Sequence, residues 1–101
     1  MSAQPLLFSR TSESRFLEFH RKNPKVYALL VEYALRAKQR GYRTYGIGAL
    51  WELVRWNQNE LFPHNVTEPK MNNNYRSFYA RMIMQQEPDL EGFFHLRELH
   101  S

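Results

Sequence analysis

The stretch 73–81 carries polar side chains whose types and spacing suit contact with DNA. If its aromatic and aliphatic residues face a core, Ala80 and five polar residues share the outer face: Asn73, Asn74, Arg76, Ser77 and Arg81. Asparagine pairs with the edge of adenine, arginine with guanine or phosphate, and a small serine permits close approach. The start of a helix adds a partial positive charge that favours phosphate. These five polar residues are therefore our candidate DNA-binding residues.

The same pattern is also typical of a solvated helix that begins with an asparagine cap. Residues 72–74 are three consecutive Asn residues, and asparagine is among the preferred residues at a helix N-cap. Both interpretations stay open at the level of sequence. One continuous positive face that includes Arg76 and Arg81 would favour the DNA-binding interpretation.

Positive charge is concentrated in residues 15–43. The chain has 14 Lys and Arg residues against ten acids, a net charge of +4. Residues 15–43 hold eight basic residues and two Glu, a net charge of +6, whereas residues 44–101 carry a net charge of −2. Phosphate contact is one use of such a field, and we assign Lys38, Arg40 and Arg43 to the DNA backbone. A solvated helix rim is the alternative.

The remaining polar residues do not indicate catalysis. The four His are not spaced to share a metal ion on a helix, and the chain has no Cys, so no metal site is expected. Glu52 and Glu60 are the only acids we would assign to a metal-dependent nuclease, which is a third hypothesis. Pairing of Glu52 with Arg55 or Arg43 is the simpler interpretation. We predict no enzyme, no catalytic residue, no metal and no cofactor.

The length of 101 residues and the content of 43% hydrophobic and 24% charged residues fit one globular domain. We expect a flexible arm over residues 1–12 and a single domain over residues 13–101. No apolar run is long enough to span a bilayer, and the N-terminus lacks the features of a signal peptide. We therefore predict a cytoplasmic protein without a membrane partner.

Helical spacing, with Pro and Gly as punctuation, predicts four helices. Asn23 and Pro24 suit the N-cap and the first residue of the second helix, and Gly41 suits the residue just past its end. The expected helices cover residues 13–22, residues 24–40, a segment that starts at Ile47 or Gly48 and has its polar end at 57–60, and residues 73–87.

Two short segments are β-prone, and their pairing would define the fold. Residues 42–46 are rich in Tyr and Thr, and apolar and polar residues alternate over 94–97 within the segment 93–99, although a helix there is not excluded. We predict a mainly α, winged-helix-like domain with a minimal two-stranded β-sheet. Residues 61–71 are longer than a standard helix-turn-helix turn, and only one strand follows the last helix.

The two tryptophans are expected to differ. Trp51 lies on the apolar face of the third helix and should belong to the core, whereas Trp56 lies off that face and should be partly exposed. Arg55 and Trp56 together suit a contact with another protein, since Trp and Arg are the usual interface anchors.

Several segments resemble a group of small uncharacterised proteins encoded in bacteriophage and prophage genomes. They are residues 19–27 (FHRKNPKVY), 45–47 (YGI) leading to Glu52 and 54–56 (VRW), and 72–75 (NNNY) followed by 79–81 (YAR). The resemblance covers roughly residues 16–99. It implies expression in a bacterial cell and a role in gene regulation, phage DNA replication or interference with a host machine. It implies no established activity or site residue.

Our functional prediction is a small phage-type protein that reads duplex DNA with its last long helix in the major groove. A homodimer is plausible, because such proteins often read palindromes. The alternative is a protein-interaction module that binds a host or phage protein complex without catalysis.

Overall fold

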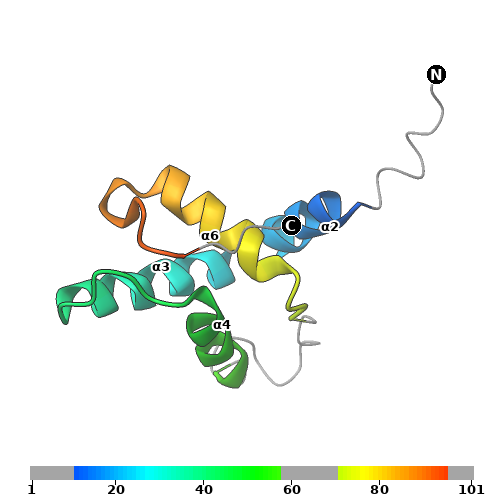
Figure 1. Ribbon diagram of the computed structural model, residues 1–101. Coiled ribbons are helices and arrows are strands. Elements are labelled where there is room, and N and C mark those ends of the chain that lie inside the picture. Colours follow the sequence, from blue (N-terminus) through cyan, green and yellow to red (C-terminus); the bar gives the residue numbers. More distant parts are fainter. Residues whose placement is uncertain (1–10, 58–70, 96–101) are drawn as a thin grey trace.

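The computed structural model describes residues 11–57 and 71–95, and this part of the chain is mainly helical (Figure 1). Its elements are α2 (Ser12–Lys22), α3 (Pro24–Gln39), α4 (Ile47–Trp56), α6 (Tyr75–Gln86) and the short 3₁₀ helix η1 (Pro88–Leu90). The prediction of a mainly α fold is confirmed. Most of the predicted arm, residues 1–10, lies outside the described residues, whereas Thr11 and Ser12 cap and begin α2.

The boundary between α2 and α3 is set by Asn23 and Pro24. Pro24 is the first residue of α3, as predicted, because its missing N–H is one that a helix start leaves unpaired in any case. Asn23 occupies the N-cap position, but its side chain does not cap α3. Its Nδ2 instead donates 3.0 Å to the carbonyl of Phe19, so this side chain closes the end of α2.

The end of α3 forms a Schellman motif. Gly41 has a φ of 104°, a conformation that costs glycine little because it has no Cβ. Its N–H donates to the carbonyl of Lys38 at 3.0 Å, and the N–H of Tyr42 donates to the carbonyl of Ala37 at 3.2 Å. The predicted role of Gly41 is confirmed.

The predicted winged-helix layout and two-stranded sheet are not confirmed. Within residues 11–57 and 71–95, the β-prone segments meet at one parallel bridge, Tyr45 with Phe94, supported by a 3.1 Å hydrogen bond from the Tyr45 N–H to the Phe93 carbonyl. Phe93 and Phe94 are both buried, whereas a half-buried strand would alternate. Residues 96–99 lie outside the described residues.

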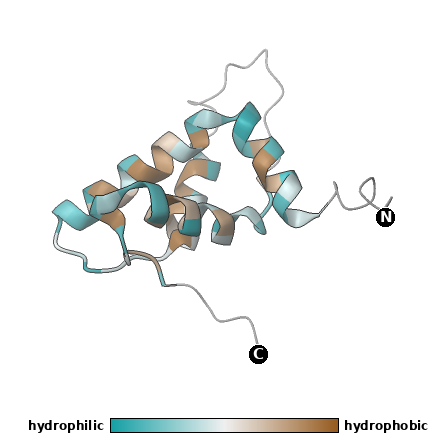
Figure 2. Cartoon of the chain, turned by 90° about the horizontal axis from the view of Figure 1, so that it is seen from above, coloured by the Kyte–Doolittle hydropathy of each residue, from teal (hydrophilic) through white to brown (hydrophobic). Residues whose placement is uncertain are grey.

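The core is an aromatic cluster between the helices. Trp51 and Tyr79 are both fully buried, with ring centroids 5.8 Å apart, which confirms the core position of Trp51. Around them pack Phe16, Phe19, His20 and Tyr75. Figure 2 shows hydrophobic and hydrophilic residues alternating along each helix, as expected when one side of a helix is buried.

The predicted outer face of α6 needs one correction. Ala80 was assigned to it but is completely buried. α6 touches α2, α3 and α4, so its buried surface is wider than the stripe of large residues indicates. Arg76 is half-buried for the same reason, whereas Ser77 and Arg81 are exposed.

α3 is also joined to the residue that follows α6. The Tyr27 hydroxyl donates a 2.9 Å hydrogen bond to the carboxylate of Glu87, which lies 60 positions later in the sequence. Burial, followed by this contact, raises the pKa of Tyr27 to about 12.

None of the described helices is long and apolar enough to cross a membrane.

Protonation of His20 is expected to destabilise the protein. Its ring lies among Phe16, Tyr27 and Tyr79, and burial lowers its pKa below the ordinary value of 6.5. A lowered pKa in the folded state stabilises the fold above pH 6.5. That stability is lost as the pH falls through the folded-state pKa. The melting temperature should therefore fall between about pH 7.5 and pH 5.

The matched variants are His20→Phe and His95→Gln. Phe keeps the ring in the cluster and removes the titrating group, whose Nδ1 is buried without a hydrogen-bond partner in the described part of the chain. Differential scanning fluorimetry should show a smaller pH dependence for His20→Phe than for wild type. His95 is exposed, so its variant should follow wild type. Identical slopes for wild type and His20→Phe would contradict the prediction.

Candidate nucleic-acid interface

The turn before α6 is built by asparagines, although not by the one at the N-cap position. The Asn72 Oδ1 accepts a 2.8 Å hydrogen bond from the N–H of Asn74. The backbone carbonyl of Asn72 accepts a 3.0 Å hydrogen bond from the N–H of Tyr75. Asn74 occupies the N-cap position without a side-chain cap bond. The amide of Asn74 is exposed, so it can contact a ligand.

Arg55 fastens this turn to α4. Its Nη1 donates 2.9 Å to Glu52, which confirms the expected pairing of that acid. Its Nη2 donates a 2.9 Å hydrogen bond to the carbonyl of Met71 and a 2.5 Å hydrogen bond to the Oδ1 of Asn73. The Asn73 oxygen is therefore occupied, and Asn73 positions the turn. No local pattern in the sequence indicates this contact, because it joins residues 18 positions apart.

An open hollow of about 590 Å³ lies beside the starts of α4 and α6. The candidate residues Asn73, Asn74, Arg76 and Ser77 line it, together with Gly46, Ile47, Gly48 and His95. The structure thus brings four of the five candidate residues of the last helix together. His95 and the first turn of α4 were not among the predicted site residues.

Arg76 lies against the first turn of α4. Its Nε donates 3.1 Å to the carbonyl of Asn73. A Cβ at Gly48 would lie only 3.2 Å from its Nη1, so the absence of a side chain at position 48 makes room for the guanidinium. This packing holds a positive group beside the hollow.

The exposed face of α6 is polar and has no carboxylate. Asn74, Ser77, Arg81 and Gln85 are exposed and follow each other at a spacing of three or four residues, which places them on one face. α6 contains no acidic residue. Gln85 extends the predicted face by one turn.

The three basic residues assigned to the DNA backbone do not join this hollow. The Lys38 ammonium donates to the carbonyl of Asp89 and so holds η1. Arg40 lines a separate groove between α3 and α4. Arg43 is exposed in the turn before α4.

Arg21, Lys22 and Arg36 of the basic segment 15–43 are paired within their own helices. The carboxylate of Glu18 lies 2.9 Å from Arg21 and 3.2 Å from Lys22, and these contacts lower its pKa. Arg36 pairs with Glu32 at 2.5 Å. Exposed pairs of this kind contribute little to stability, and their two Glu are already counted in the net charge of +6 for this segment. Arg40 and Arg43 have no ion pair with a described residue.

Within the described residues, no group of three His, Cys, Asp or Glu is placed to hold a metal ion. Glu52 is bound to Arg55, and Glu60 lies outside the described residues.

No family model, curated protein or solved structure matches the chain. The resemblance to bacteriophage and prophage proteins therefore stays a prediction.

Proposed function

We propose that the protein binds duplex DNA through the exposed face of α6. The observation that carries this proposal is the chemistry of that face, which presents amides, a hydroxyl and a guanidinium without any carboxylate. Amides and guanidinium groups are the side chains that read base edges in the major groove. A carboxylate there would repel the phosphates.

The roles within this face differ. Asn74, Ser77 and Arg81 have exposed side chains that can meet base edges or phosphates. Asn73 holds the turn before α6 against α4 through its hydrogen bond from Arg55. Arg76 donates its Nε to the Asn73 carbonyl, which leaves its Nη groups for a phosphate. The N–H groups at the starts of α4 and α6 add partial positive charge.

The winged-helix-like layout belongs to the same proposal. α4 and α6 touch each other, and α6 would serve as the recognition helix with α4 as its supporting helix. Arg43, exposed in the turn that leads into α4, is the backbone contact we retain from the predicted set. Binding as a homodimer to a palindromic site is part of this hypothesis.

Fluorescence anisotropy with a labelled duplex, measured at about 50 mM and 200 mM salt, tests the proposal. We expect Arg81→Ala to weaken binding by about tenfold and to reduce the slope of log affinity against log salt by about one. Arg21→Ala is the matched control, because Arg21 is also exposed but is paired with Glu18 on α2. No binding by wild type at about 50 mM salt would overturn the proposal.

A role in binding another protein is the second candidate, and the exposure of Trp56 favours it. This side chain is 81% exposed, and tryptophan is enriched among the residues that anchor protein interfaces. Arg55, its predicted companion, is engaged within the protein. A contact at this end of α4 would therefore depend on Trp56.

A further inference from the structure

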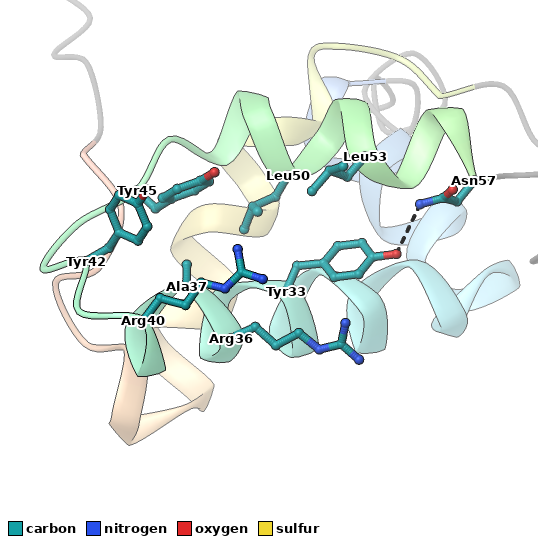
Figure 3. A pocket seen from close by; sticks show the side chains of 9 residues that line it. All are labelled: Tyr33, Arg36, Ala37, Arg40, Tyr42, Tyr45, Leu50, Leu53 and Asn57. Carbon is teal, nitrogen blue, oxygen red and sulfur yellow. Dashed lines mark hydrogen bonds between the residues drawn. The ribbon is translucent and has the colours of Figure 1, made fainter.

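A groove of about 370 Å³ runs between α3 and α4, away from the face of α6 (Figure 3). Tyr42 and Tyr45 lie at one end of it, with ring centroids 5.1 Å apart. At the other end the Asn57 Nδ2 donates a 3.3 Å hydrogen bond to the Tyr33 hydroxyl. Both ends of the groove are thus formed by side chains of described elements.

The α4 side of the groove and its Tyr42 end are apolar and partly open to solvent. Leu50 is buried at its base, whereas Leu53 and Tyr42 are 44% and 52% exposed. Exposed leucine and tyrosine on two sides of one hollow would gain free energy if an apolar side chain covered them. The shape therefore suits one aromatic or aliphatic side chain of a partner.

The α3 side of the groove is cationic. Arg36 and Arg40 both line it, and no described acid does. Arg36 keeps an exposed pair with Glu32, whereas the Arg40 guanidinium makes no hydrogen bond with a described residue. Guanidinium groups bind carboxylates in a bidentate manner, so the charge of the groove is complementary to an acidic ligand.

We propose that this groove binds an acidic peptide segment of a partner protein, with a Phe or Leu side chain between the walls and neighbouring Asp or Glu side chains on Arg40 and Arg36. Nucleic acid fits less well, because its backbone has no apolar group to cover Leu53. The inference does not depend on DNA binding through α6. It gives the protein a candidate site for another protein that is separate from Trp56.

Nuclear magnetic resonance titration of ¹⁵N-labelled full-length protein tests this proposal. The probe is a peptide of about ten residues with a central Phe-Leu pair flanked by Asp. We expect its addition at millimolar concentration to shift the amides of Ala37, Tyr42 and Leu53 and not those of α6. Control peptides replace every Asp by Lys, or the Phe-Leu pair by Ser-Ser, and neither should shift these amides.

Arg40→Gln should weaken binding of the acidic probe by at least about fivefold, whereas Arg21→Gln, on α2, should leave it unchanged. Both positions are exposed, and an unaltered far-ultraviolet spectrum checks that the variants fold. Equal shifts with the Lys peptide, or no shift with the Asp peptide, would overturn the proposal. Shifts of the same groove amides by a DNA duplex would also overturn it. Failure of DNA binding would appear separately, at the amides of α6.

Discussion

Replacing Trp51 by alanine is expected to lower the free energy of unfolding by about 3–5 kcal/mol. Trp51 is fully buried, and its ring lies 6.4 Å from that of Phe19 and 5.8 Å from that of Tyr79. The substitution would leave a cavity where α2, α4 and α6 meet. Since small domains are stable by about 5–15 kcal/mol, this variant should be substantially unfolded or close to it.

Urea unfolding followed by circular dichroism measures this loss, and the chain contains its own control. Trp56 is 81% exposed, so Trp56→Ala removes the same atoms from the same helix and should change stability by less than about 0.5 kcal/mol. An equal loss for the two variants would show that Trp51 is not the centre of the core.

A third variant separates the stability that packing contributes from the cost of burying an unpaired polar group. The Trp51 Nε1 is buried and finds no acceptor in the described part of the chain. Trp51→Phe keeps a ring and removes that unpaired donor, whose burial itself costs about 1–3 kcal/mol. We expect it to lose about half as much stability as the alanine variant, or less.

Arg55→Met is expected to lower the free energy of unfolding by about 2 kcal/mol. Methionine keeps an unbranched side chain but loses the hydrogen bonds to the Met71 carbonyl and to Asn73. Both of these bonds join α4 to the turn before α6. The variant should therefore loosen the start of α6, and should weaken DNA binding by more than its loss of one charge explains.

Arg36→Met is the matched control for this variant. Arg36 also pairs with a Glu of its own helix, but both side chains of that pair are exposed and the pair makes no hydrogen bond to another described element, so its loss should cost less than about 0.5 kcal/mol. Thermal or urea unfolding of the two variants compares them directly. Equal effects would mean that Arg55 contributes only its pair with Glu52.

Local signals in the sequence predicted the helices well. Pro24 can begin a helix but not continue one, and Gly41 tolerates the left-handed conformation that ends α3. These signals act over a few residues, so they can be recognised without knowing the fold. The predicted start of the last helix at residue 73 was two residues early, because Asn73 and Asn74 belong to the turn.

Contacts between distant segments could not be predicted from local patterns in the sequence. The assignment of Lys38 to DNA rested on its charge and place at a helix end, whereas in the fold it holds η1. The groove beside Arg40 depends on how α3 crosses α4. Of the candidate face of α6, the exposure of Ser77 and Arg81 follows from helical spacing, but the burial of Ala80 depends on three packed neighbours.

The hydrogen bond between Tyr27 and Glu87 has a consequence for the order of folding. α2, α3 and α4 follow each other closely in sequence and pack together, so their contacts close short loops. The contact from Tyr27 to Glu87 closes a loop of 60 residues, whose entropy must be lost before the contact stabilises anything. We therefore expect the contacts among the first three described helices to form early in folding, and the return of α6 and η1 to α3 to form later.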